Sequence, residues 1–466
     1  MGGPPMRPRS RPHPKLRRRD NVTHDPTSFE IDRTQRRLGP IWLSPSITPV
    51  NVLTLFYSAM MTIVFITSLG LLHPYLLHAH LEMPTGIQGD FTGNLSVVIE
   101  LVAIALVAPV GVFSDRLGRR RIFVAGFLAI ALGLTLIPLA RTPIVLIMLR
   151  MISSAGIAAC TIMLASCIAD YAQNASRGKL ISVNGVITGF GVVVISSFIF
   201  ARLPKFYAEL GAAPIEAGTL TFWTMAAIAV LTALITWLGV KDGDPRKGKK
   251  RQPPLELLRT GIGEVRKNPK LGLSCAAAFV SRGDLTVLAT FFALWIMAVN
   301  TDQGIMPDSA QSEAGRLFGI SQFAMLIFTP VIGFIVDRLD RVTALIIAFA
   351  VATVGYLALG IVGDPLTSPL IYLVAIMAGA GEACIIVAGP ALVGQEAPAP
   401  ARGSIIGVVG FFGAVGVLIN LKLSGIIFDA WMYQGPFILM AGMNLAVMIY
   451  AIVVRLKYGA RLSTDI

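Results

Sequence analysis

Charged side chains are scarce in this sequence. They make up 14% of its 466 residues, whereas a soluble domain carries about 25%. Hydrophobic residues make up 55%, and the mean hydropathy is +0.72. A surface this poor in charge cannot be wetted by water alone, so an ordinary soluble protein is excluded and burial in a lipid bilayer is favoured.

Cysteines and catalytic motifs are also few. No CxxC pair, Walker A, GxSxG or HExxH sequence occurs, so we expect no enzyme, no ATP-driven pump, no metal site and no cofactor. The cysteines lie in apolar runs, where we expect small buried residues without disulfides. There are four of them: Cys160, Cys167, Cys275 and Cys384.

The formal net charge is +13, which in a soluble chain would suggest nucleic-acid binding. Here the basic residues lie in short segments between long apolar runs, which is typical of a membrane protein that faces anionic lipid. We therefore expect the lipid bilayer as partner and no nucleic acid. No apolar stretch precedes Val52, so no signal peptide is expected.

Twelve apolar runs are long enough to cross ~30 Å of hydrocarbon as helices, which takes about 20 residues each. They predict an all-α membrane protein with two six-helix bundles, 51–240 and 271–456. The runs are 52–76, 91–113, 121–140, 143–167, 179–203, 218–240, 271–299, 315–336, 342–363, 369–393, 404–428 and 435–455.

The distribution of Lys and Arg predicts the orientation. Of 39 such residues, 32 fall in segments on one side of the predicted membrane and four on the other. Positive loops stay inside, so both termini are expected in the cytoplasm, at a bacterial cytoplasmic (inner) membrane.

Three segments lie outside the bundles. We expect 1–50 to be a basic, largely disordered tail on anionic headgroups, and 457–466 to be a second cytoplasmic tail. Within the linker 241–270, apolar residues at helical spacing predict a short helix on the membrane surface; a disordered charged loop is the alternative. These apolar residues are Leu255, Leu258, Ile262 and Val265.

Two local patterns recur across the halves. The segment 111–120 (GVFSDRLGRR) recurs at 333–341 (GFIVDRLDR), 222 residues later, and Arg177-Gly178 recurs at Arg402-Gly403, 225 residues later. Each copy occupies the same place in its half. Two matches in register indicate duplicated parallel halves, which place a substrate site between them near the midplane.

The segment 111–120 resembles the loop signature G-x-x-x-D-R-x-G-R-R of the major facilitator superfamily, although Asp340 replaces a glycine in the second copy. The resemblance implies a secondary transporter whose loop is a gate; we expect it to act as a monomer. A carboxylate there can accept hydrogen bonds from a neighbouring helix terminus in one state and release them in the other. The gating residues implied are Gly111, Asp115, Arg116, Gly118, Arg119, Asp337, Arg338 and Arg341.

Two further segments have weaker family likeness. Arg150, followed by small residues, resembles a motif of proton-linked members, and the fifth span resembles the antiporter signature but has Phe190 where that signature has proline. Glycines in the fifth and eleventh spans predict close helix contacts near the seam between halves. They are Gly185, Gly189, Gly191, Gly407, Gly410, Gly413 and Gly416.

Six ionisable residues fall within the spans, where each costs ~2.5–3.5 kcal/mol at a helix centre. Their depths predict that Glu100 pairs with Arg150, and that Arg282 acts with Asp284 or Glu382. Such groups could carry protons or anchor a charged substrate, and structural ion pairs are the alternative. The sixth residue, Lys422, is expected to extend toward the nearer membrane surface.

The sequence therefore favours proton-coupled movement of a small organic molecule, with export as the expected direction. One alternative is an organic-anion carrier in which Arg150 and Arg282, one from each half, bind a carboxylate or phosphate. An uptake symporter is a second alternative. A membrane receptor or scaffold that transports nothing is a third possibility, against which an intact gating loop argues.

Overall fold

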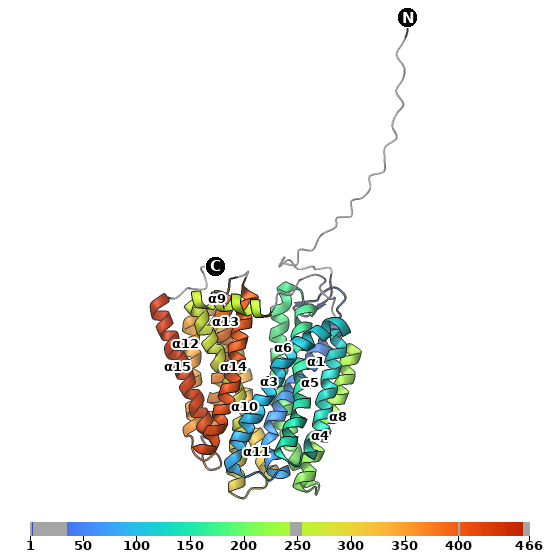
Figure 1. Cartoon of the computed structure of the whole chain (residues 1–466), viewed down its shortest axis with the longest axis vertical. Helices are drawn as coiled ribbons and strands as arrows, with labels where there is room; N and C mark the ends of the chain where they lie inside the picture. The colour runs from blue at the N-terminus through green and yellow to red at the C-terminus, as the bar shows by residue number, and fades with distance from the viewer. Residues whose placement is uncertain (1, 3–34, 243–253, 399–400, 460–466) are drawn as a thin grey trace.

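The computed structural model describes residues 2, 35–242, 254–398 and 401–459, and within them twelve helical segments are long and apolar enough to cross a membrane. The predicted all-α, twelve-span architecture is confirmed. The segments form two bundles that lie side by side (Figure 1). We call the end at which β1 (Arg37–Leu38) and the end of α15 (Gly435–Tyr458) lie the terminal face, and the opposite end the distal face.

The N-terminal bundle contains the first six spans. They are α1 (Pro49–Leu71) with α2 (His73–Tyr75) and the π-helix η1 (Leu76–His80); α3 (Thr85–Leu117); α4 (Arg119–Leu136) with η2 (Ile137–Leu139); α5 (Pro143–Tyr171); η3 (Asn174–Ser176) with α6 (Arg177–Gly191), the π-helix η4 (Val192–Ile199), η5 (Phe200–Arg202) and α7 (Leu203–Glu209); and α8 (Pro214–Gly239).

The C-terminal bundle contains the other six spans. They are α10 (Pro269–Asp302), α11 (Pro307–Arg338), α12 (Arg341–Ile361), α13 (Ile371–Glu396), α14 (Arg402–Ala430) and α15.

Local sequence explains where several spans begin. The Thr48 and Asn51 side chains form a capping box at the start of α1, and Thr142 caps α5. Proline occupies the first helical turn of both helices, where its missing N–H leaves no bond unmade. Many helices extend beyond the predicted apolar runs; α3 reaches from Thr85 to Leu117, for example, because a helix continues past the hydrocarbon that hydropathy detects.

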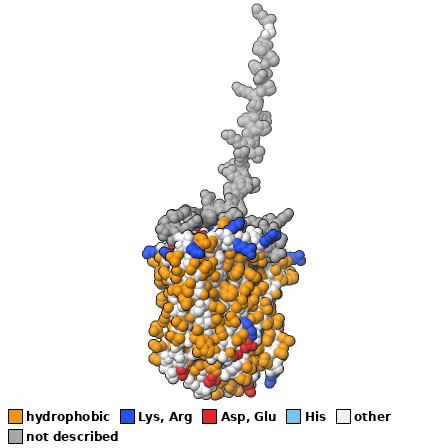
Figure 2. Space-filling view, turned by 60° about the vertical axis from the view of Figure 1, so that its left-hand side comes forward, with side chains coloured by type: hydrophobic (Ala, Val, Ile, Leu, Met, Phe, Trp, Pro, Cys, Tyr) orange, Lys and Arg blue, Asp and Glu red, His pale blue; other side chains and the backbone are white. Residues whose placement is uncertain are grey.

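The surface of the bundles fits a bilayer. Hydrophobic side chains cover most of the lateral surface, and Lys and Arg gather near the terminal face (Figure 2). Such an apolar band bounded by basic residues is the pattern of a membrane-embedded protein.

An N-terminal hairpin packs on the terminal face of the first bundle. Strands β1 and β2 (Ile41–Trp42) pair around Gly39, whose φ is +55°. Leu43, which is fully buried, bridges to Ala172 between α5 and η3. Residues 35–48 are thus ordered, in contrast to the disordered tail expected over 1–50, whereas residues 3–34 lie outside the described part.

The linker contains a helix, α9 (Pro254–Lys267), in the segment where apolar spacing predicts one. It lies across the terminal face, roughly perpendicular to the spans (Figure 1). Gly261 packs against α14, because a Cβ there would lie only 2.5 Å from the carbonyl oxygen of Ser404. The alternative of a disordered loop does not hold for these residues.

Candidate functional site

The two bundles meet along the distal part of the seam between them. On one side α3 packs against α14, and a Cβ on Gly93 would lie 2.9 Å from the carbonyl oxygen of Leu421. On the other side α11 packs against η4 and η5, and a Cβ on Gly315 would lie 2.4 Å from Cβ of Ala201. Glycines at these positions therefore allow the two halves to approach each other closely.

Toward the terminal face the bundles diverge (Figure 1). Gly185 of α6, with Gly407 and Gly410 of α14, has no atom within 4 Å of the position a Cβ would occupy. These are three of the glycines predicted to make close contacts at the seam. The structure is therefore a conformation closed at the distal face, with its terminal ends apart.

Two carboxyl groups are completely buried inside the C-terminal bundle. Asp284 of α10 and Glu382 of α13 both have 0% exposure. Asn444 donates to Oδ1 of Asp284 and Gln322 donates to Oε2 of Glu382, each at 3.0 Å. The second oxygen of each carboxyl group, Oδ2 and Oε1, has no hydrogen-bond partner.

Tyr356 of α12 completes this group, which we call the buried carboxyl cluster. Its side chain is fully buried, and its hydroxyl has no hydrogen-bond partner but lies within electrostatic reach of both Asp284 and Glu382. Within the described residues, neither carboxyl group forms an ion pair with Lys, Arg or His within 4.0 Å. The cluster is thus acidic and uncompensated.

Arg282 does not join this cluster, contrary to the sequence-based prediction. Its side chain is exposed and crosses Gly413 of α14, where an added Cβ would lie 2.4 Å from Cδ of the arginine. Glu100 of α3 lies within electrostatic reach of Arg282, from the opposite bundle, without a direct ion pair to it. Since Asp284 lies two positions from Arg282 on one helix, the two side chains leave on different faces.

Arg150 of α5 is also placed differently from the prediction. It is buried, with 7% exposure, and donates to the carbonyl oxygen of Leu69 on α1 at 3.2 Å. No ion pair within 4.0 Å joins it to Glu100 in the described part of the chain; its charge acts on His73 instead. The predicted Glu100–Arg150 pair is therefore not formed.

The first copy of the signature loop is fastened within its own bundle. Gly118 has φ +90°, and the following helix α4 is capped by Asp242, whose Oδ1 accepts the Arg120 N–H at 2.8 Å. Arg119 forms an ion pair with Asp170 of α5. Of the remaining signature residues, Gly111, Asp115 and Arg116 lie in the last turns of α3, and the Asp115 side chain lies outside the described part.

The second copy shows why Asp340 can replace the glycine. Asp340 has φ −54° and caps α12 with its own carboxylate, which accepts the Thr343 N–H at 3.0 Å. Beside it, Asp337 and Arg341 form an ion pair at 3.2 Å, and the Arg338 guanidinium stacks on Phe334. An aspartate thus supplies here the cap that Asp242 supplies to the first copy.

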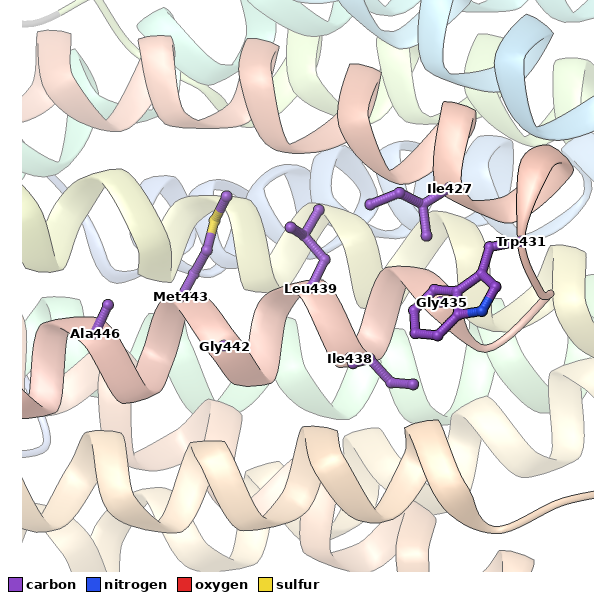
Figure 3. A pocket seen from close by; sticks show the side chains of 8 residues that line it. All are labelled: Ile427, Trp431, Gly435, Ile438, Leu439, Gly442, Met443 and Ala446. Carbon is purple, nitrogen blue, oxygen red and sulfur yellow. The ribbon is translucent and has the colours of Figure 1, made fainter.

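Two apolar grooves on the bundles contain no polar site. One, of about 370 Å³, lies between α14 and α15 and runs from Trp431 to Ala446 (Figure 3). The other, of about 490 Å³, lies at the seam between η4 and α11 and includes Phe198 and Phe323. Among the described residues, no group of three or more His, Cys, Asp and Glu is arranged to hold a metal ion.

Comparison with known proteins identifies the family. The model described as Major Facilitator Superfamily matches residues 50–300 and 274–463. The chain belongs to the major facilitator superfamily. Its fold and family are those of membrane transporters, as the signature loops suggest.

Two curated relatives of this chain are magnetosome proteins. The magnetosome protein MamH of Paramagnetospirillum magneticum is 26% identical over 407 residues, covering 85% of this chain and 91% of MamH. MamZ of Magnetospirillum gryphiswaldense is 26% identical over 376 residues, 78% of this chain; the chain spans about half the length of MamZ, with 56% of it covered.

Two solved transporters share the fold of this superfamily member. A mutant of the nucleoside transporter NupG has a TM-score of 0.70 and 16% identity, with 86% of this chain and 99% of that chain covered. The inward-open xylose transporter XylE from E. coli has a TM-score of 0.65 and 15% identity, with 86% and 94% covered.

Sequence reasoning missed a third polar group of this transporter, at the distal seam. Lys422 of α14 forms an ion pair with Asp90 of α3 in the other bundle, rather than extending to the membrane surface. Lys422 stands out as an in-span charge, but Asp90 precedes the predicted second span and carried no signal of its own.

Proposed function

We propose that this superfamily member is a proton-coupled secondary transporter, which moves a small organic molecule by alternating access between its two bundles. We propose further that it resides in a bacterial cytoplasmic membrane with the terminal face inside, in keeping with the Lys and Arg distribution. Export is the direction expected from the sequence.

The buried carboxyl cluster carries this proposal. Two carboxylates that lie close together in a medium of low dielectric cannot both remain ionised without a cation. Asp284 and Glu382 have no basic partner within 4.0 Å among the described residues, and each has a free oxygen. A proton held by the pair removes one of the two negative charges and lets one of the free oxygens act as a donor.

Coupling requires that the proton alter the balance between conformations. The cluster draws its members from α10, α12 and α13, with hydrogen bonds from α11 and α15. Loss of the proton adds an uncompensated charge where five helices pack, and these helices can relieve that charge only by moving apart or admitting water. We propose that this rearrangement inside the C-terminal bundle links proton binding to the movement of that bundle against the other.

Glu100 and Arg282 support a substrate role at the seam. They come from opposite bundles, carry opposite charges and lie within electrostatic reach of each other, without an ion pair within 4.0 Å. Both are thus free to bind polar groups of a substrate. The anion alternative would need Arg150 beside Arg282, but the Arg150 guanidinium donates to Leu69 on α1.

The test begins with a ligand. A thermal-shift screen of the purified protein against metabolites and drugs at two pH values identifies one, and its labelled form is followed in proteoliposomes with an imposed pH gradient. We expect Asp284→Asn and Glu382→Gln to abolish gradient-driven flux and to retain exchange of ligand across the membrane without a gradient. Glu313→Gln, which alters a half-buried carboxylate paired with Arg316, is the matched control.

Three results would count against the proposal. Gradient-driven flux that is unchanged in both carboxyl variants would remove the proton-carrier role. Loss of gradient-driven flux in the Glu313→Gln control would show that the assay responds to any lost carboxylate. Ligand binding without flux of any compound would favour the receptor or scaffold alternative.

A further inference from the structure

A carboxylate crosses the seam between the bundles at the distal end. Asp429, near the end of α14, accepts the Gly89 N–H with Oδ1 at 2.8 Å and the Asp90 N–H with Oδ2 at 2.6 Å. Both donors belong to α3 in the N-terminal bundle. Bonds from backbone N–H groups to an ionised carboxylate are stronger than neutral ones, so these contacts favour the closed seam.

A lysine forms a second link about two helical turns earlier on α14. Nζ of Lys422 lies 2.5 Å from Oδ1 of Asp90 and 2.8 Å from Oδ1 of Asn94. Asn94 in turn donates to the other oxygen of Asp90 at 2.9 Å. The Lys422 and Asp90 side chains are 37% and 45% exposed, so this link lies at the edge of the contact between the bundles.

The two helices approach each other closely beneath these links. A Cβ on Gly89 would lie 2.7 Å from the carbonyl oxygen of Gly425, and a Cβ on Gly425 would lie 2.4 Å from that of Gly89. The helices α3 and α14 therefore touch through their backbones. Any separation of the bundles at this end lengthens the bonds of Asp429 and Lys422 together.

The opposite seam lacks such charge contacts. There α11 packs on η4 and η5 through Gly315 and Gly319, and the hydrogen bond that crosses it nearby is from Gln311 to the carbonyl oxygen of Leu71, at 3.0 Å. No ion pair joins α11 to the N-terminal bundle among the described residues. Electrostatic control of distal closure is thus concentrated between α3 and α14.

We propose that Asp90, Lys422 and Asp429 form a distal latch, which holds the transporter closed at the distal face and must break for that face to open. The proposal rests on alternating access and adds the residues that set the balance between the two states. It does not depend on which substrate or ion is carried.

Two reporters, each with one added cysteine, measure this balance in detergent-purified protein without substrate. Ser197→Cys lies on the opposite seam, is 2% exposed and packs against Gly319, so it reacts with a polar thiol reagent only when the distal side opens. Gly185→Cys reports the terminal side, where a Cβ has free space. All four native cysteines are buried, so the parent protein gives the labelling baseline.

The latch variants are Asp429→Asn, which places an amide N–H group against a backbone N–H, and Lys422→Met, which removes the charge at similar size. Each is expected to raise the labelling rate at position 197 about tenfold and to lower that at position 185, since one charge-assisted bond is worth about that factor. The matched control is Asp364→Asn, a distal aspartate that bonds to Gln303 within its own bundle.

Pairing specificity separates a latch from general loosening. The exchange Asp90→Lys with Lys422→Asp is expected to restore slow labelling at position 197, whereas either change alone does not. Unchanged rates at both reporters in the latch variants would overturn the proposal, as would a rise at both reporters together. Because no flux is measured, failure here leaves the test of proton coupling unaffected.

Discussion

Gly118 is the position at which the first signature loop is most sensitive to substitution. Its φ of +90° and ψ of 149° lie in a region that residues with a Cβ rarely adopt. A Cβ there would also lie 2.9 Å from Oδ2 and 3.0 Å from Oδ1 of Asp242. We expect Gly118→Ala to destabilise the N-terminal bundle, because it strains the backbone and displaces the carboxylate that caps α4.

The size of the effect follows from these two contributions. Holding a residue with a Cβ in such a backbone conformation costs about 1–3 kcal/mol. Loss of the bond from the Arg120 N–H to Asp242 removes a helix cap, which costs about 0.5–2 kcal/mol. The free energy of unfolding is therefore expected to fall by about 3 kcal/mol.

The equivalent position in the second loop should respond differently. Asp340 has an ordinary backbone conformation, with φ −54°, and caps α12 itself. Replacing a capping aspartate with glycine costs only a few tenths of a kcal/mol. Asp340→Gly, which restores the family signature, is thus expected to be nearly neutral, although Asp340 also lies 4.0 Å from Arg455.

Denaturant titration in detergent micelles, followed by circular dichroism, measures both effects. Gly178→Ala is the matched control, since this helical glycine of α6 faces open space and alanine is a better helix former. A Gly118→Ala protein whose unfolding free energy stays within about 0.5 kcal/mol of the parent would refute the strain argument.

Three other substitutions test the packing of the bundles. The Tyr171 hydroxyl accepts the Lys241 N–H at 2.8 Å and donates to the Lys241 carbonyl oxygen at 2.6 Å. Tyr171→Phe removes both bonds, so the free energy of unfolding should fall by about 1–3 kcal/mol. An unchanged value would mean that water replaces both bonds. Gly379→Ala places a carbon 2.0 Å from the Ser321 carbonyl oxygen and should lower the free energy of unfolding by about 1–3 kcal/mol. Gly442→Ala is its control: this glycine faces open space, so the same titration should find the change neutral or stabilising. Leu43→Asp should undock residues 35–48 and speed tryptic cleavage at Arg36 and Arg37, and equal cleavage rates would show that the hairpin is not held by this side chain.

The spans and the duplicated halves could be predicted because hydrocarbon thickness acts directly on the sequence. A run of apolar residues must cross the bilayer as a helix, and charged loops stay outside. Helix ends were less accurate, as in the second span, because α3 continues to Thr85 through polar residues that hydropathy does not count.

Rotation about the helix axis could not be predicted, and it decides which charges meet. Glu100 and Arg150 lie at similar predicted depths, yet Arg150 faces α1 and Glu100 faces the opposite bundle. The two acids Asp284 and Glu382 were recognised as in-span charges, but their shared burial away from Arg282 depends on five helices packing together. The distal latch could not be predicted for another reason. Asp429 binds backbone N–H groups. Every residue except proline carries such a group, so the sequence does not mark the partner of Asp429.

The two ends of α3 lead to a final prediction. This helix carries Gly89 and Asp90 near its distal end and the signature Asp115 near its terminal end, about 37 Å apart at 1.5 Å per residue. A stiff helix in contact with α14 at one end is held away from it at the other, so we expect the latch and the signature loop to stabilise opposite states. Asp429→Asn alone should therefore speed labelling of Ser197→Cys, and adding Asp115→Asn should return that rate toward the parent value. Labelling that rises further in the double variant would show that the two ends act independently. In that case α3 would have to bend, and Pro109, which lies inside the helix, is where a bend is expected.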